Sequence, residues 1–222
     1  MSARLAFLHT NFVLVDPIRS LSRELLRDTP TFHVVDESLL SDILAAGGLT
    51  NGVIRRIARL AISAEEAGAA TVVLTCSSAS PSVGIVRSML KVPLLAIDEA
   101  MAEEAVARAV RIGVLATVRT TIQPTRDLVE AKARTAHRRV EVLAEVCAEA
   151  FEALMRGERG EHDRLVTARC RALAQKVELI LFAQGSMAPL AEQLRAEIPI
   201  LTSLELGVRR AGEVFCRETA RA

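Results

Sequence analysis

The feature that most constrains the fold is an internal repeat of about 107 residues. Residues 5–10 (LAFLHT) line up with residues 112–117 (IGVLAT), which sets the offset at 107. Farther along, Cys76 pairs with Gln184 at an offset of 108, so the spacing is kept within one residue. A period this long indicates a duplicated α/β unit and two domains, because solenoid repeats are much shorter.

Each half alternates short apolar segments with amphipathic ones, which predicts parallel strands joined by helices. We therefore expect an α/β protein of two pseudo-symmetric flavodoxin-like domains, each with a parallel sheet of about four strands. The expected strands are Leu5–Leu8, Thr31–Val35, Thr71–Thr75 and Val92–Ile97 in the first half, and Ile112–Ala116, Val140–Val146, Leu179–Ala183 and Ile198–Leu201 in the second.

Capping residues and glycines place the helices between these strands. The expected helices are Pro17–Arg27, a short one that follows Asp36 and Ser38 and stops at Gly47, one from Thr50 to Gly68, Pro81–Leu90, Asp98–Val110, Ile122–Ala136, two stretches broken at Gly157 and Gly160, one after Ser186, and a terminal helix.

Cys76 stands where a buried strand ends and a loop of small residues opens a helix. The free N–H groups and the dipole of a helix start stabilise an anion, so this position favours a thiolate. The alternative is a packing role, which is the commonest fate of a free cysteine.

Polar loops follow the strands that the repeat makes equivalent. Ligands of open parallel sheets bind beyond the carboxyl ends of the strands. If the two halves face each other, four loops line one interdomain cleft suited to a carboxylate, although each Ser or Thr taken singly could be a helix cap. The loops are His9-Thr10-Asn11, Cys76-Ser77-Ser78, Thr117 to Thr121, and Gln184-Gly185-Ser186.

Composition excludes several classes of function. A net charge of +1 provides no field to attract nucleic acid or an anionic membrane, and the chain has no Trp or Tyr to stack on bases. No apolar run approaches the length of about 18 residues that suggests a membrane span. The four cysteines show no C-x-x-C pairing and no histidine at metal spacing. We expect a cytoplasmic protein with no metal and with no nucleic-acid or membrane partner.

Three segments lie at strand ends that the repeat relates. They are Leu74-Thr75-Cys76-Ser77-Ser78, Ile112-Gly113-Val114-Leu115-Ala116-Thr117 with Thr120, and Leu181-Phe182-Ala183-Gln184-Gly185-Ser186-Met187. These segments resemble motifs of the aspartate/glutamate/hydantoin racemase superfamily, which also includes maleate isomerase and arylmalonate decarboxylase.

The resemblance covers nearly the whole chain and implies an enzyme without a cofactor. It implies that Cys76 is the acid–base thiol, and that a substrate carboxylate is held by loop N–H groups and by Ser77, Ser78, Thr117 and Thr120. It also implies that the C-terminal helix returns to the first domain, so that residues 1–97 with 203–222 form one lobe and 98–202 the other. A small carboxylate substrate and a homodimer are expected on the same basis.

One position departs from the family pattern. Gln184 stands where racemases carry their second cysteine, and a primary amide does not titrate in the range that acid–base catalysis needs. Three hypotheses follow: a racemase or isomerase acting at the carbon α to a carboxylate, with His9 or Ser186 as an unusual second acid–base; a single-thiol decarboxylase or other lyase; and a carboxylate-binding protein without catalysis.

The remaining candidates are residues near the loops. Thr10, Asn11 and Gly185 are expected to contact the substrate. Arg119 either binds a second acidic group of the substrate or points to solvent. The cysteines at 147, 170 and 216 are expected to pack among apolar neighbours within or at the ends of helices.

Overall fold

The fold is described from a computed structural model, which covers residues 3–195 and 197–221. The chain divides into two compact units. Unit 1 consists of the residues up to Asp98 together with the segment from Leu204 onward, and unit 2 is Glu99–Ser203.

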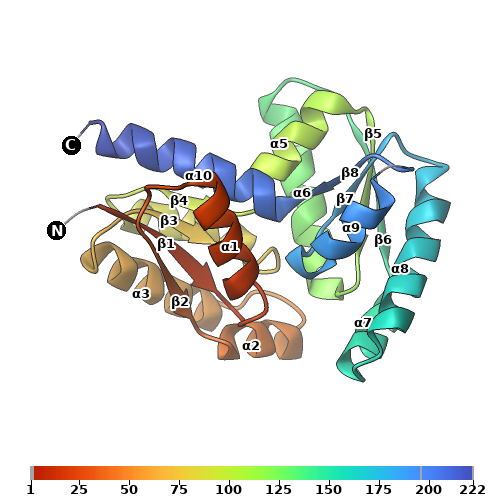
Figure 1. The fold of residues 1–222 in the computed structure, drawn as a ribbon, viewed down its shortest axis with the longest axis horizontal. Coiled ribbons are helices and arrows are strands. Elements are labelled where there is room, and N and C mark those ends of the chain that lie inside the picture. Colours follow the sequence, from red (N-terminus) through yellow and green to blue (C-terminus); the bar gives the residue numbers. More distant parts are fainter. Residues whose placement is uncertain (1–2, 196, 222) are drawn as a thin grey trace. The chain divides into compact units, whose positions relative to one another are not determined.

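Unit 1 is built on a four-stranded parallel sheet in the order β2-β1-β3-β4. Its elements are β1 (Arg4–His9), α1 (Val15–Leu25), β2 (Thr31–Val35), α2 (Ser38–Ala46), α3 (Asn51–Glu66), β3 (Ala69–Leu74), the 3-10 turn η1 (Ser80–Ser82), α4 (Val83–Val86), the 3-10 turn η2 (Arg87–Met89), β4 (Leu94–Ala96) and most of α10 (Ser203–Thr219) (Figure 1).

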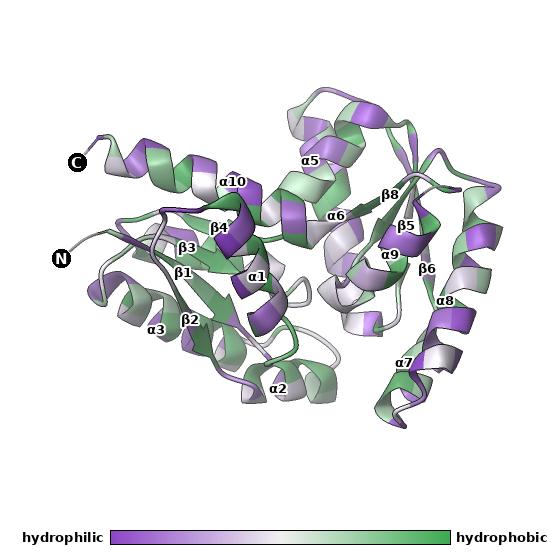
Figure 2. Cartoon of the chain, in the orientation of Figure 1, coloured by the Kyte–Doolittle hydropathy of each residue, from purple (hydrophilic) through white to green (hydrophobic). Residues whose placement is uncertain are grey.

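Alternation along β1 gives the sheet of unit 1 two buried faces. Ala6 and Leu8 belong to one core cluster with Ile43 of α2 and Ile57 of α3. Phe7 points to the opposite face and is fully buried as well. In Figure 2 the strands are mostly hydrophobic, whereas the helices alternate between hydrophobic and hydrophilic residues, as helices covering a sheet should.

The C-terminal helix α10 packs directly on unit 1. A Cβ atom placed on Gly207 would lie 2.3 Å from the carbonyl oxygen of Ile97, and one on Gly212 would lie 2.4 Å from Leu26 Cδ2 at the end of α1. Only glycine permits so close an approach of the helix to the chain that follows β4. The helix is therefore seated against Ile97 and Leu26, which lie more than 100 positions earlier in the chain.

Unit 2 repeats the same topology, with strand order β6-β5-β7-β8 and all pairs parallel. Its elements are α5 (Glu99–Arg108), β5 (Arg111–Ala116), α6 (Arg119–Thr135), β6 (Glu141–Val146), α7 (Ala148–Met155), α8 (Arg159–Ala174), β7 (Leu179–Phe182), the 3-10 turn η3 (Gly185–Met187), α9 (Ala188–Leu194) and β8 (Ile200–Thr202).

One face of the second sheet packs against α7, α8 and α9. Leu115, Ile180 and Phe182 from the strands join Cys170 of α8 and Leu190 of α9 in a single buried cluster. Helix α8 lies so close to β5 that a Cβ atom on Gly113 would be 2.9 Å from Leu173 Cδ2. Gly113, the small residue of the segment 112–117, thus permits close packing of the helix on the sheet.

The predicted fold is confirmed: two parallel four-stranded sheets with flanking helices and the flavodoxin-like strand order. Several boundaries were wrong. Helix α6 starts at Arg119, so Thr120 lies in its first turn and not in a loop, and Gly160 lies inside α8. The segment after Pro81 is helical, as expected, but is broken into η1, α4 and η2.

Candidate active site

Cys76 follows the carboxyl end of β3, as the sequence predicted. Cys76 is half-buried. The turn that follows it is closed by a hydrogen bond of 2.9 Å from the Ala79 N–H to the Cys76 carbonyl oxygen. The Thr10 hydroxyl and the backbone N–H groups of Ser78 and Ala79 donate hydrogen bonds toward its sulfur. The end of β1 and the start of the turn therefore surround one thiol in unit 1.

The electrostatic environment of Cys76 differs from the expectation. Burial raises the pKa of the thiol above its usual value and outweighs the opposite effect of Thr10, Ala79 and Ser78. The negative charge of Asp98 adds to the increase in pKa. The resting sulfur is therefore a protonated thiol at neutral pH, and the expectation of a thiolate was wrong because desolvation exceeds the hydrogen bonds that favour the anion.

Asp98 is a buried carboxylate beside this turn. It is 0% exposed, and the Ser80 hydroxyl donates to its Oδ1 at 2.8 Å. The same hydroxyl lies 3.3 Å from the Cys76 carbonyl oxygen, so Ser80 ties the turn to the end of β4.

Ser77 and Ser78 are buried polar residues in the same turn. Within the described part of the chain, the Ser77 hydroxyl has no hydrogen-bond partner, so it is available to a bound oxygen. Thr10 is 2% exposed and is already directed at the sulfur. Unit 1 thus groups hydroxyls and backbone N–H donors around its thiol, as a site for a carboxylate would require.

His9 points away from the thiol, to the other face of β1. Its Nδ1 lies 3.0 Å from the Thr75 hydroxyl, and its Nε2 lies 2.9 Å from Nδ1 of His33. Thr75 donates its single hydroxyl hydrogen to the Leu8 carbonyl oxygen at 3.0 Å. His9 Nδ1–H must then donate to Thr75, and His33 Nδ1–H must donate to His9.

The histidine pair is held in a neutral state. Burial, the neighbouring His33 and the charge of Arg19 lower the pKa of His9 to about 4. Burial and Arg19 lower the pKa of His33 as well, and its Nε2 is buried with no hydrogen-bond partner among the described residues. The neutral imidazole of His9 is stacked on His33, tilted against Phe7 and 1% exposed, so it has no free nitrogen for a substrate.

In unit 2, Gln184 and Thr117 come together at the carboxyl ends of β7 and β5. Oε1 of Gln184 accepts hydrogen bonds from the Thr117 N–H at 2.6 Å, the Val118 N–H at 3.1 Å and the Thr117 hydroxyl at 3.1 Å. The position that the repeat pairs with Cys76 is therefore a structural amide that holds the turn before α6.

The other predicted site residues occupy varied positions. Asn11 is half-buried, and its Oδ1 accepts from the Val13 N–H at 3.0 Å, an interaction typical of a turn. Arg119 is exposed and Thr120 half-buried. Gly185 and Ser186 are half-buried in η3, where no histidine or carboxylate of the described residues hydrogen-bonds the Ser186 hydroxyl. Ser186 thus lacks the adjacent base that would activate it.

Two residues that contact His9 were not among the predicted site residues: Thr75 and His33. Thr75 directly precedes Cys76, and its burial at the strand end was the available signal. The parallel pairing of β1 with β2 places Phe7 opposite His33, so the two histidines share one face of the sheet. Only a known strand pairing would have revealed that contact.

The remaining cysteines divide between core and surface. Cys147 and Cys170 are buried in the unit 2 cluster, which confirms a packing role. Cys216 on α10 is exposed, so the expectation that it packs among apolar neighbours was wrong.

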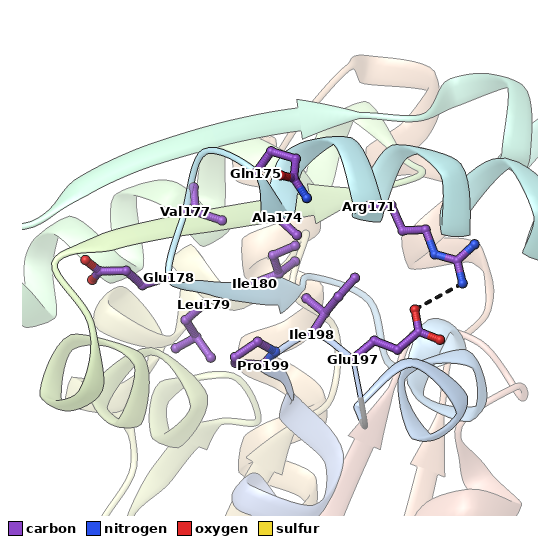
Figure 3. Close-up of a pocket in the computed structure, with 10 residues that line it drawn as sticks. All are labelled: Arg171, Ala174, Gln175, Val177, Glu178, Leu179, Ile180, Glu197, Ile198 and Pro199. Atoms are coloured by element: carbon purple, nitrogen blue, oxygen red, sulfur yellow. Dashed lines mark hydrogen bonds and ion pairs between the residues drawn. The ribbon is translucent and has the colours of Figure 1, made fainter.

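A pocket of about 350 Å³ lies at the opposite edge of the second sheet (Figure 3). Glu178 and Pro199 lie at its wall, directly before β7 and β8, and an ion pair of 3.1 Å joins Arg171 to Glu197 beside it. It is therefore at the amino ends of the strands, whereas Gln184 follows the carboxyl end of β7. This pocket is not part of the predicted site.

Among the residues that the structure describes, no group of three or more His, Cys, Asp or Glu side chains is placed to hold a metal ion. In the same part of the chain, none of the helices is long and apolar enough to cross a membrane.

Comparison with known proteins agrees with this architecture. The sequence matches the Asp/Glu/Hydantoin racemase family over residues 9–211. A search of curated proteins found no significant match. The glutamate racemase of Thermus thermophilus superposes with a TM-score of 0.75 at 17% identity, covering 98% of this chain and 82% of that one.

Two other solved structures are similar. The aspartate racemase of Picrophilus torridus gives a TM-score of 0.74 at 11% identity over 96% of this chain and 95% of that one. The allantoin racemase of Klebsiella pneumoniae gives 0.65 at 22% identity over 97% and 89%. At these sequence identities, the structural similarity shows a shared fold.

Together, the fold and the sequence match define the class. The protein is an α/β enzyme with two parallel four-stranded sheets, of the racemase type. More specifically, the chain belongs to the Asp/Glu/Hydantoin racemase family.

Proposed function

We propose that this enzyme transfers a proton to or from the carbon α to a carboxylate, with Cys76 as its only acid–base thiol. The observation that carries the proposal is the position of Cys76 after the end of β3, where the Thr10 hydroxyl and the backbone N–H groups of Ser78 and Ala79 donate hydrogen bonds toward its sulfur. A carboxylate bound there would accept hydrogen bonds from Ser77 and from backbone N–H groups of the same turn.

For the reaction to begin, the Cys76 thiol gives its proton to water. When the Cα–H bond breaks, the resulting thiolate takes the proton, and the electron pair stays on Cα, delocalised into the carboxylate. Return of that proton from sulfur restores the starting configuration. Inversion requires a water molecule on the opposite face to protonate Cα, and the hydroxide so formed takes the proton from the sulfur. Hydrogen-bond donors near the carboxylate stabilise the negative charge that develops on it. An isomerase or racemase that works by this proton transfer requires no cofactor.

A second candidate is decarboxylation. It is favoured by two observations: the resting thiol is protonated, and the position of the second racemase cysteine holds an amide engaged with Thr117 and Val118. In this reaction the bond between Cα and one carboxylate breaks, carbon dioxide leaves, and the electron pair on Cα takes the proton of the Cys76 thiol. Water then returns a proton to the sulfur.

Deuterium oxide separates these functions. The wild-type protein is incubated in it with aspartate, glutamate, alanine and phenylmalonate. Loss of the Cα–H signal in proton NMR, without loss of mass, is expected for an isomerase or racemase, and release of carbon dioxide for a lyase. Cys76→Ala should reduce either rate by about 100-fold or more, which is typical for loss of an acid–base group.

Cys216→Ser is the matched control, because Cys216 is an exposed thiol on α10 outside the proposed site. It should react at the wild-type rate. Turnover that survives in Cys76→Ala would contradict the assignment of the thiol. Absence of exchange and of carbon dioxide with all the acids would instead favour a binding protein.

A further inference from the structure

Three donors converge on one atom of Gln184. Two of them are the consecutive backbone N–H groups of Thr117 and Val118, and the third is the Thr117 hydroxyl. Backbone N–H groups can only donate, so the atom that faces them is the amide oxygen Oε1 and not the nitrogen. The orientation of the carboxamide is therefore determined by its neighbours.

These donors are the ones that the family resemblance assigns to a substrate carboxylate. Consecutive N–H groups just before α6, with a hydroxyl beside them, suit an oxygen that carries negative charge. In this chain the oxygen that they hold is neutral and belongs to the protein. Its shortest contact, 2.6 Å to the Thr117 N–H, leaves no room for a second acceptor on that hydrogen.

We infer that Gln184 is a specificity-determining residue: its side-chain oxygen occupies the donors of Thr117 and Val118, so that this loop does not bind a substrate carboxylate. The substrate then presents one carboxylate, to the donors around Cys76 in unit 1. This second statement rests on the proposed function. It makes a monocarboxylate the favoured substrate class, with a dicarboxylate disfavoured.

The same geometry determines what Gln184 offers to a ligand. With Oε1 held by three donors, Nε2 is fixed as a donor of two hydrogens on the other branch of the carboxamide. An amide N–H suits a neutral acceptor, such as a carbonyl oxygen. It is a weaker partner for a carboxylate than the cluster of N–H groups that its own oxygen occupies.

The inference can be tested without turnover by titrating acetate into ¹⁵N-labelled protein. In the wild type, the amide signals of Thr117 and Val118 should not respond in a saturable way. In Gln184→Ala the freed N–H groups should bind acetate, and both signals should shift with an affinity at least about tenfold higher. Gln184→Glu should remain unresponsive, because its carboxylate would take the same donors.

Gln193→Ala is the control for losing a glutamine, since Gln193 is exposed on α9 and distant in sequence from the loop. It should behave as the wild type does. If Gln184→Ala fails to fold, Gln184→Ser provides the same test, because its short side chain also leaves room for acetate. Signals of Thr117 and Val118 that ignore acetate in a folded variant would overturn the inference, as would an equal response in the wild type.

A second measurement addresses the substrate class. Relative to wild type, Gln184→Ala should raise kcat/KM for aspartate against alanine by at least about tenfold. If Gln184→Ala gains acetate binding but the ratio of kcat/KM for aspartate to that for alanine is unchanged, the inferred substrate class is refuted. The finding that Gln184 occupies the donors of Thr117 and Val118 is then unaffected. If the wild type turns over none of the acids while acetate binds to Gln184→Ala, the proposed function is refuted. The inference that Gln184 blocks a carboxylate from this loop is then still supported.

Discussion

Nε2 of His9 lies 2.9 Å from Nδ1 of His33, and the two rings are stacked with their centroids 5.1 Å apart. The pair lies on the face of β1 opposite to Thr10, directly behind the turn that carries Cys76. Through Thr75, its hydrogen bonds end at the backbone of Leu8. The hydrogen-bonded histidine pair therefore stabilises the end of β1 within unit 1.

Acidification should destabilise the protein through His9. Its pKa is lowered from 6.5 to about 4 in the folded state, so between these values the unfolded chain binds the extra proton. The stability contributed by the neutral ring is complete above the unfolded pKa and is lost as the pH falls toward 4. The loss should amount to about 3 kcal/mol. Urea unfolding across this pH window measures it.

Comparing the wild type with His9→Gln separates the contribution of His9 from that of other groups. Asp36, whose carboxyl pKa is also lowered, contributes equally to both proteins. The stability of this variant should depend less on pH than that of the wild type. His137→Asn is the control, because His137 is exposed and has a φ of 53°, which asparagine tolerates. Parallel pH profiles for wild type and His9→Gln would show that the buried pair does not titrate as stated.

The thiol of Cys76 should be alkylated slowly at neutral pH. Because burial raises its pKa above the usual 9.0, iodoacetamide should modify it more slowly than a free cysteine at about pH 8, with the rate rising at higher pH. Peptide mass spectrometry in a Cys216→Ser background isolates the reaction, since the exposed Cys216 would otherwise react first. A rate that is already maximal below about pH 8 would mean an activated thiolate.

Asp98→Asn provides a directional check on the cause. Removing the carboxylate charge should lower the pKa of Cys76 and speed alkylation at about pH 8, because that charge raises the pKa in the wild type. The asparagine can still accept the hydrogen bond from Ser80.

Gly207→Ala should strongly destabilise the seating of α10. The added methyl group would lie 2.3 Å from the Ile97 carbonyl oxygen, and backbone cannot move aside as a side chain can. We expect a loss of about 3 kcal/mol in the free energy of unfolding, measured with urea. Gly160→Ala is the matched control in α8, where nothing lies within 4 Å of the new methyl group. It should be neutral or stabilising by about 0.5 kcal/mol, and equal effects of the two changes would contradict the tight seating of α10.

Much of the fold could be predicted because its causes are local or periodic. The repeat, the apolar strands and the caps are written in consecutive residues: Thr50 accepts a hydrogen bond from the Val53 N–H, and Gly47 ends α2 with a φ of 69°. Boundaries were less predictable, because α6 recruits Arg119 and Thr120 without a side-chain cap and α8 tolerates Gly160. In both cases helix packing on the sheet outweighs the local signal.

The sequence by itself determined the architecture and the place of the thiol, because strand order and loop position follow from the hydrophobic pattern and its repetition. Only the tertiary structure decided the chemical state of that thiol, the pairing of His9 with His33, and the partners of Gln184. The reason is physical. Desolvation and hydrogen bonding depend on atoms brought close by folding, as Thr117 and Gln184 are across 67 positions of chain, and no pattern of neighbouring residues records that approach.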